Sequence, residues 1–184
     1  PRGLTMTTID RKVALHIVQN GDICFDNVFI PFENALPVQA DFRRSAGLPE
    51  VLAHSRLLVA WLPVGVGMGV FDVVLRYLKE RQQFGASLAS LAISQEKLAR
   101  MAGSICAGWA LCERLTATFP CDLGPSKKCD AFSIGMPHVA MIKAWSTREG
   151  RAVVSLGREL LGGNGIIVDF HVAKAFADLE ALYT

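Results

Sequence analysis

The sequence is poor in charge. Asp, Glu, Lys and Arg together make up only 20% of its 184 residues, and 19 basic residues nearly balance 17 acidic ones. The net charge of +2 lacks the basic excess that nucleic-acid binding usually needs, so nucleic acid is not expected as a partner. Apolar residues make up 51% of the chain, which excludes disorder for most of its length.

The sequence also lacks an apolar run long enough for a membrane span, which needs about 20 mainly apolar residues. Its longest uncharged stretch, residues 57–71, is shorter than that and contains Pro63. We therefore expect a buried core helix here and no membrane span. The start of the sequence shows no signal-peptide pattern.

Patterns typical of metal sites and disulfide frameworks are missing as well. The five cysteines include no C-x-x-C pair, and the four histidines are dispersed without an H-E-x-x-H motif. We expect no disulfide framework and no metal site. The cysteines are expected to be free thiols in largely apolar surroundings.

The first part of the chain is rich in residues that favour β-strands. Residues 13–18 and 23–30 are two such runs, and Asn20-Gly21 between them is a strong hairpin signal, because both central residues of a type I′ turn need positive φ. The pattern predicts one antiparallel hairpin that ends at Pro31. A lone hairpin is marginally stable in water, so we expect these strands to belong to a larger sheet.

From about Leu48 the apolar pattern becomes helical and predicts a long helix that is bent near Pro63 and is ended by Gly85 and Ala86-Ser87. The glycines at positions 65, 67 and 69 lack the spacing and the preceding strand of a dinucleotide-binding loop, so they predict close helix packing. A second helix follows, with an apolar face made of Leu98, Met101, Ala102, Ile105, Trp109 and Cys112.

Two more helices complete the pattern. A third has Pro137 in its first turn and ends at Gly162-Gly163, as glycine often ends a helix. A fourth is predicted from Asp169, a good N-cap, to about Leu179. Helices joined by short loops pack antiparallel, so we expect a mainly α fold built on an antiparallel four-helix bundle.

Two segments carry candidate functional residues. In the run from Glu80 to Gly85, Arg81 is either a solvated charge that complements the helix dipole or a planar fork for a phosphate, with Phe84 as a flat wall for a ring. In the run from Arg158 to Gly165, three glycines in four residues either cap a helix or let a nucleotide approach closely. The composition of each segment alone favours the simpler reading, a solvated helix end for the first and a helix cap for the second.

Taken together, these segments resemble the acyl-CoA dehydrogenase and acyl-CoA oxidase superfamily. The resemblance spans nearly the whole chain: residues 20–31 look like the family's last middle-domain strands, and Arg56, residues 80–85 and residues 161–165 follow in the family's order and spacing. Residues 158–166 are most similar to the short-chain acyl-CoA oxidase and glutaryl-CoA dehydrogenase branch.

The resemblance implies two units. Residues 1–35 are the last strands of the middle β domain, and residues 36–184 form the helical C-terminal domain. It also implies FAD as the cofactor, a short-chain acyl-CoA as the substrate, and oxidation of its Cα–Cβ bond to a trans-enoyl-CoA. A homo-oligomer arranged as a dimer of dimers is implied as well, and residues 119–135 form a longer loop than is usual in the family.

The same resemblance assigns roles to individual positions. Arg56 matches an arginine close to the acyl-CoA pocket. The positions expected to meet the FAD of a neighbouring subunit are Arg81, Gln83, Phe84, Glu159, Leu161, Gly162 and Gly163, of which the last four line its adenosine end.

The catalytic base is not expected within this sequence. Family members carry a glutamate in a Tyr-Glu-Gly-Thr stretch, which is expected just after Tyr183-Thr184, and the alternative position used by some members is Ser55 here. We therefore expect the domain to be truncated before the catalytic Glu and these 184 residues alone to be inactive.

One alternative function remains at this stage, a catalytically silent helical module that uses the same bundle only to oligomerise. A visible absorbance spectrum distinguishes the two functions, because bound FAD absorbs visible light and a pure oligomerisation module is colourless. The expected compartment is the mitochondrion or peroxisome in a eukaryote and the cytoplasm in a bacterium.

Overall fold

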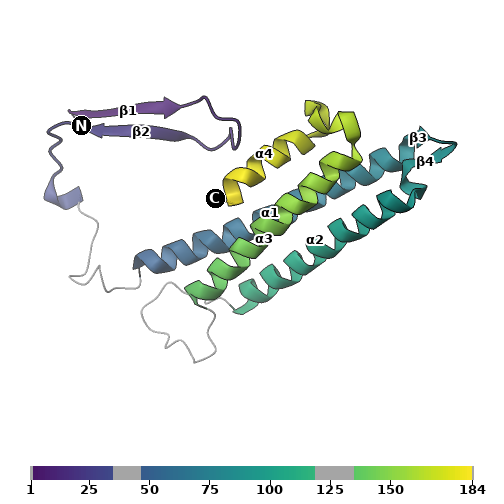
Figure 1. Cartoon of the computed structure of the whole chain (residues 1–184). Helices are drawn as coiled ribbons and strands as arrows, with labels where there is room; N and C mark the ends of the chain where they lie inside the picture. The colour runs from purple at the N-terminus through teal and green to yellow at the C-terminus, as the bar shows by residue number, and fades with distance from the viewer. Residues whose placement is uncertain (1, 35–46, 119–134, 184) are drawn as a thin grey trace.

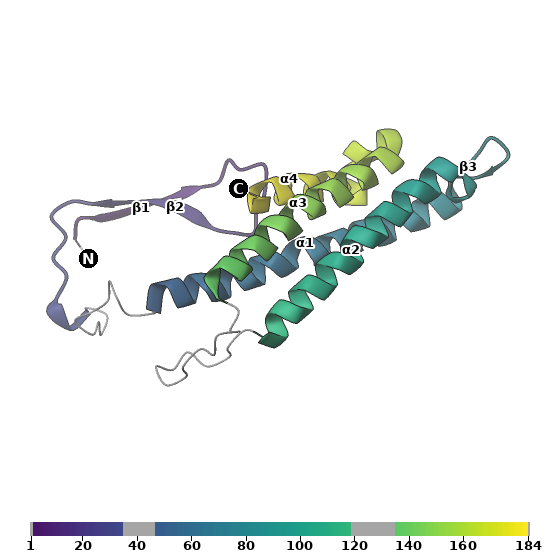
Figure 2. The same ribbon diagram turned by 60° about the horizontal axis from the view of Figure 1, so that its bottom comes forward.

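The computed structural model describes residues 2–34, 47–118 and 135–183. It contains four helices, α1 (Gly47–Glu80), α2 (Ala92–Thr118), α3 (Met136–Leu160) and α4 (Val172–Tyr183), preceded by a hairpin of β1 (Leu4–Ile9) and β2 (Asn20–Phe25) (Figure 1). Successive helices run in opposite directions, and a second view shows α4 lying along α3 (Figure 2). The predicted fold class, a mainly α bundle with a strand pair before it, is confirmed.

Short elements connect these helices. A small hairpin of β3 (Gln82–Gln83) and β4 (Ala86–Ser87) leads from α1 to α2. The remaining elements are four 3-10 turns, η1 (Phe32–Asn34), η2 (Leu88–Ser90), η3 (Gly162–Ile166) and η4 (Val168–Phe170).

The core forms where the apolar faces of the helices meet. Val74 on α1, Met101 on α2, Val154 on α3 and Leu179 on α4 are completely buried in one cluster. A second cluster around Ala60 and Cys112 fills the other end of the bundle. These positions recur at helical spacing, so burial of one face on each helix drives the assembly of the bundle.

Helix α1 is covered on one side only. Leu58 is 68% exposed, Leu62 49% and Met68 45%, so the expected buried core helix is only partly confirmed within this chain. By length and composition alone, Val51–Glu80 could also cross a membrane, and 33% of its most apolar stretch is buried. Core helices of soluble proteins pass the same test, so this observation is weak evidence for a membrane span.

The N-terminal hairpin differs from its prediction. β2 pairs with Leu4–Ile9, not with residues 13–18, and Asn20 lies in the ladder opposite Ile9. Asn20 and Gly21 therefore belong to a strand and form no turn, and neither has a positive φ. The strand predicted at 13–18 is not formed, and the strand predicted at 23–30 overlaps β2 at residues 23–25 only. The turn signal misplaced the pairing, because the actual partner strand lies further upstream.

A lysine organises the connection between the two strands. The Lys12 ammonium donates hydrogen bonds to the carbonyl of Leu15 at 3.1 Å, to the carbonyl of Val18 and to the side chain of Asn20 at 2.8 Å. These bonds hold residues 10–19 in a compact loop. The Asn20 side chain, which suggested a turn, is instead an acceptor for Lys12.

The start of the fourth helix also differs from its prediction. Asp169 lies in η4, and α4 begins at Val172, two residues later than a helix capped by Asp169 would begin. His171 has a positive φ of 59°, which ends η4, and its carbonyl accepts a hydrogen bond from the Ala175 amide in the first turn of α4.

Two predicted packing positions need correction. Trp109 is 46% exposed, and its ring meets Trp61 edge-to-face on the surface instead of lying in the core. Of the glycines at positions 65, 67 and 69, only Gly67 lies close to another helix, with Ile105 and Val153 at 3.4 Å from where a Cβ would be.

The close approach of α1 and α3 depends on glycines of α3. A Cβ on Gly150 would lie 2.6 Å from Cβ of Pro63, and one on Gly157 would lie 2.5 Å from Cγ1 of Val70. These distances leave no room for a methyl group, so the two helices pack backbone against side chain. Pro63 is buried at this contact within α1.

We predict that Gly157→Ala lowers the free energy of unfolding by about 1–3 kcal/mol, because the added methyl overpacks the contact with Val70. Gly69→Ala is the matched control: no heavy atom lies within 4 Å of its Cβ position, and alanine favours a helix by up to about 1 kcal/mol. Urea unfolding of both variants measures the difference. Equal stability of the two would contradict the close packing.

A buried carboxylate attaches the hairpin loop to the bundle. Asp178 on α4 is 9% exposed, and its Oδ1 accepts a hydrogen bond from the Leu15 amide at 2.7 Å, while its Oδ2 binds the Lys174 ammonium. Burial by itself raises the pKa of Asp178, but the hydrogen bonds from Lys174 and Leu15 outweigh burial and hold the pKa below its ordinary value.

We expect this attachment to be acid-sensitive. A carboxylate with a depressed pKa contributes stability that is present above its unfolded pKa of about 3.9 and is lost as the pH falls through the folded value. Asp178→Asn should therefore reduce the free energy of unfolding at about pH 7 and have a smaller effect near about pH 3. Asp72→Asn, which removes an exposed carboxylate paired with Arg76, is the control and should have little effect at either pH. If Asp178→Asn lowers the free energy of unfolding equally at both pH values, the negative charge of Asp178 is not what stabilises the attachment.

Candidate functional site

The first candidate segment is a tight hairpin at the far end of α1. Helix α1 ends at Glu80, and Gln82 and Gln83 then pair antiparallel with Ser87 and Ala86. The two residues between the strands, Phe84 and Gly85, have φ values of 56° and 79°. A two-residue hairpin with a type I′ turn needs positive φ at both positions, so the turn conformation that Asn20-Gly21 suggested occurs here instead.

The side chains of this hairpin point away from the bundle. Phe84 is 91% exposed although it holds a left-handed backbone conformation that is unfavourable for a bulky residue. Arg81 is exposed, and no described residue offers its side chain a hydrogen bond or an ion pair. The Arg81 backbone is held firmly, because its amide donates to Tyr77 and its carbonyl accepts from Leu88, both at 2.9 Å.

The second candidate segment follows the end of α3. Gly162 and Gly163 are exposed, and Gly162 has a φ of 59° that turns the chain into η3. Leu161 is only 2% exposed and packs in the core, so its side chain anchors the loop and only its backbone could face a ligand. Of this segment, Gly162, Gly163 and Glu159 are therefore accessible to a ligand, whereas Gly165 is buried.

Glu159 in the last turn of α3 has a cationic partner. Lys97 of α2 binds the Glu159 carboxylate at 2.8 Å, and this hydrogen bond, with the charge of Lys97, lowers the pKa of Glu159. Glu159 is therefore an anion at neutral pH that can accept hydrogen bonds from hydroxyl groups. The sequence analysis missed Lys97, because the pairing joins residues that are 62 positions apart.

A direct side-chain contact connects the two segments. Asn164 in η3 donates a hydrogen bond from Nδ2 to Oη of Tyr77, one turn before Arg81, at 3.2 Å. The structure thus brings Arg81, Gln83 and Phe84 to the same end of the bundle as Glu159–Gly163. Tyr77 and Asn164 were not predicted as site residues, although Asn164 lies inside the glycine-rich run.

Arg56 lies elsewhere. It lies 24 residues before Glu80, the last residue of α1, which corresponds to about 36 Å at 1.5 Å per residue. Its Nη1 lies 3.4 Å from Sδ of Met136 at the start of α3. Within this chain, the structure does not bring Arg56 together with the other predicted site residues.

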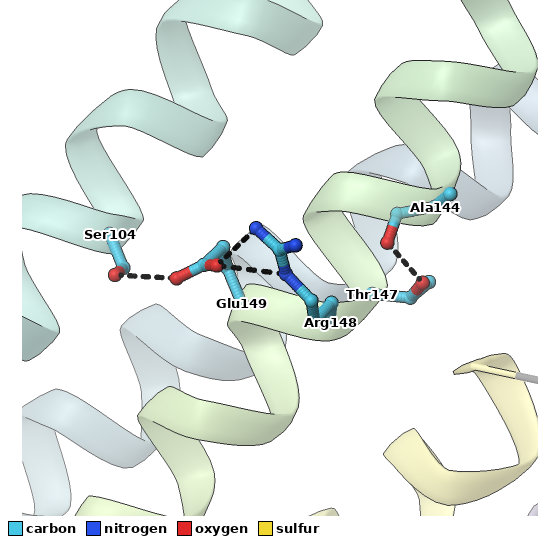
Figure 3. A network of polar contacts seen from close by, with 5 residues as sticks. All are labelled: Ser104, Ala144, Thr147, Arg148 and Glu149. Carbon is cyan, nitrogen blue, oxygen red and sulfur yellow. Dashed lines mark hydrogen bonds and ion pairs between the residues drawn. The ribbon is translucent and has the colours of Figure 1, made fainter.

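A further polar cluster lies between α2 and α3. Ser104 donates a hydrogen bond to Oε2 of Glu149 at 3.2 Å, and Arg148 binds Oε1 at 3.0 Å (Figure 3). The adjacent cavity of about 10 Å³ holds at most one water molecule. Both oxygens of Glu149 therefore have partners within this chain.

The described cysteines are free, and they differ in environment. Cys112 is buried as predicted, and burial raises the pKa of its thiol to about 11, which makes it inert. Cys24 and Cys106 are exposed, which contradicts the apolar surroundings expected for them. Cys121 and Cys129, like the long loop predicted at 119–135 up to residue 134, lie outside the described residues.

The groups at the end of the bundle fit a dinucleotide. A guanidinium without a protein partner suits a phosphate, an exposed aromatic ring suits a flat ring system, and a carboxylate beside exposed glycines suits a ribose. All three groups are exposed at this end of the bundle, so they suit a ligand that is also bound by another molecule. The chemistry of these groups is therefore compatible with FAD.

Comparisons with known proteins all point to one family. Residues 48–184 match the family description "Acyl-CoA dehydrogenase, C-terminal domain". A glutaryl-CoA dehydrogenase of Desulfococcus multivorans is 27% identical over 94% of this chain and 41% of its own length. A mitochondrial isovaleryl-CoA dehydrogenase of Solanum tuberosum is 26% identical over 97% of this chain and 41% of its own.

A solved structure shares the fold. The glutaryl-CoA dehydrogenase of Mycobacterium smegmatis in complex with FADH2 superimposes with a TM-score of 0.84 at 24% identity, covering 100% of this chain and 44% of that one. The chain thus spans less than half the length of the relatives it matches.

Proposed function

We propose a function from the premise that this chain belongs to the acyl-CoA dehydrogenase family, whose C-terminal domain matches its residues 48–184. In the whole protein, residues 1–35 complete the middle β domain and residues 36–184 form the helical domain. The whole protein oxidises the Cα–Cβ bond of a short-chain acyl-CoA to a trans-enoyl-CoA with FAD as its cofactor.

The observation that carries this proposal is the exposed hairpin at the end of α1. Phe84 is 91% exposed in an unfavourable backbone conformation, and nothing within the described chain uses its ring. A strained, exposed aromatic residue beside a free guanidinium has no stabilising role in this chain, so its role lies in contact with another molecule.

Each group has a distinct task at the cofactor. When bound, FAD supplies the redox chemistry of the reaction. Arg81 binds a phosphate group, Phe84 and Gln83 contact the cofactor beside it, and Glu159 with Gly162 and Gly163 lines the adenosine end. Arg56, at the other end of α1, contacts the acyl-CoA.

The outward direction of these side chains supports a cofactor shared between copies of the chain. We propose a homo-oligomer, arranged as a dimer of dimers, in which each chain contacts the FAD of its neighbour. Relatives of this chain include bacterial enzymes and a mitochondrial one, and we propose the bacterial cytoplasm or the mitochondrion as its compartment.

We predict that the whole protein is purified with a visible flavin spectrum and that Arg81→Lys reduces FAD affinity about tenfold. A lysine keeps the charge but loses the bidentate fork. Arg76→Lys is the matched control, because Arg76 is exposed and pairs with Asp72 on its own helix. The FAD affinity of both variants is compared with that of wild type by the flavin content that remains after dialysis.

Turnover of the whole protein with short-chain acyl-CoAs tests the reaction itself. Parallel assays with oxygen and with an artificial electron acceptor distinguish an oxidase from a dehydrogenase. A colourless protein without turnover would contradict the proposal and favour the silent oligomerisation module. Equal FAD retention in Arg81→Lys and wild type would return Arg81 to the role of a surface charge.

We also predict that the exposed face of α1 forms a subunit contact. Replacing Leu58 and Leu62 by glutamate places two charges on this apolar face and should shift the protein toward smaller species in sedimentation at micromolar concentration. Both side chains are exposed within one chain, so helicity by circular dichroism should be unchanged. A wild-type protein that sediments as a stable monomer would contradict this prediction.

A further inference from the structure

One hydrogen bond connects the two segments of the candidate cofactor site. Nδ2 of Asn164 donates to Oη of Tyr77 at 3.2 Å, across 87 positions of sequence. Both side chains are half-buried, and the Tyr77 ring packs edge-to-face on Phe170, with centroids 5.7 Å apart. The ring is therefore held in place independently of its hydroxyl group.

Each partner is tied closely to one of the two segments. The carbonyl of Tyr77 accepts the Arg81 amide at 2.9 Å, so Tyr77 lies one helical turn before the exposed hairpin. Asn164 directly follows Gly162-Gly163. Its backbone N–H donates a hydrogen bond to the carbonyl of Leu161 at 3.2 Å. A shift of the Asn164 side chain relative to Tyr77 therefore moves the glycine loop relative to Arg81.

The loop depends on such a contact more than the hairpin does. η3 is a short 3-10 turn, Gly162 and Gly163 have no heavy atom within 4 Å of their Cβ positions, and their backbone is exposed. A glycine-rich segment has high conformational freedom when it is not held. The hairpin, in contrast, grows directly out of a 34-residue helix.

We propose that Tyr77 is a positioning residue of the cofactor site. Its hydroxyl accepts the hydrogen bond from Asn164 and so fixes the distance between the Gly162–Gly163 loop and the Arg81–Phe84 hairpin. Both segments can then contact one dinucleotide without the loop having to become ordered on binding. This inference rests on the proposed FAD site. The gain is in preorganisation, because Tyr77 acts on the loop through Asn164.

The test measures FAD binding to the apo form of the whole protein by flavin fluorescence. Tyr77→Phe keeps the ring and its packing on Phe170 but removes the acceptor, so we expect the Kd for FAD to rise about fivefold. Asn164→Ala should raise it by a similar factor. The double variant should be no weaker than the weaker single variant, because both changes remove the same bond.

Thr116→Val is the matched control. It removes a hydroxyl that accepts a hydrogen bond between α1 and α2, from Nε1 of Trp61 at 3.0 Å, at the opposite end of α2 from the site. We expect Thr116→Val to lower the thermal midpoint of the apo protein and to leave the Kd for FAD unchanged. Hydrogen exchange of residues 162–167 should accelerate in Tyr77→Phe and not in Thr116→Val.

The outcomes separate this inference from the function on which it rests. A wild-type protein that does not bind FAD defeats the proposed function, and the inference falls with it. If wild type binds FAD and Tyr77→Phe binds it equally well, only the positioning role is overturned. Fully additive effects of the two single variants would also overturn it, because the residues would then act separately.

Discussion

The contact between α1 and α3 is the constraint on which the rest of this structure depends. Gly150 and Gly157 let α3 approach Pro63 and Val70 so closely that a methyl group has no room between them. Because the two helices run in the same direction, their C-terminal ends lie toward the same end of the bundle (Figure 1). The segments after Glu80 and after Leu160 are therefore neighbours, although about 80 residues separate them.

This arrangement gives the candidate site a rigid base and an exposed surface. Leu161 and Leu78 are buried in the core directly behind it, while Arg81 and Phe84 extend beyond it into solvent. The Lys97–Glu159 ion pair and the Tyr77–Asn164 hydrogen bond join the helix ends laterally. A surface built in this way can present several polar groups to a ligand without first folding around it.

The two candidate segments could be recognised from the sequence because each is short and carries a local signal. Arg81 and Phe84 are close in sequence at the end of an apolar helix, and the glycines of residues 162–165 follow another. Tyr77 and Lys97 could not be predicted, since each looks like an ordinary helix residue. Their partners, Asn164 and Glu159, are more than 60 residues away, and only packing brings them together.

The sequence by itself determined the helices, because burial of one face at a period of 3.6 residues is a local property of each segment. Tertiary structure decided the hairpins. The signal at Asn20-Gly21 predicted a turn, but the pairing of β2 with Leu4–Ile9 and the hydrogen bonds of Lys12 placed those residues in a strand. At Phe84-Gly85 a turn formed where the sequence suggested a helix end. Strand pairing and turn position depend on which distant segments meet, and this is settled by the free energy of the whole fold.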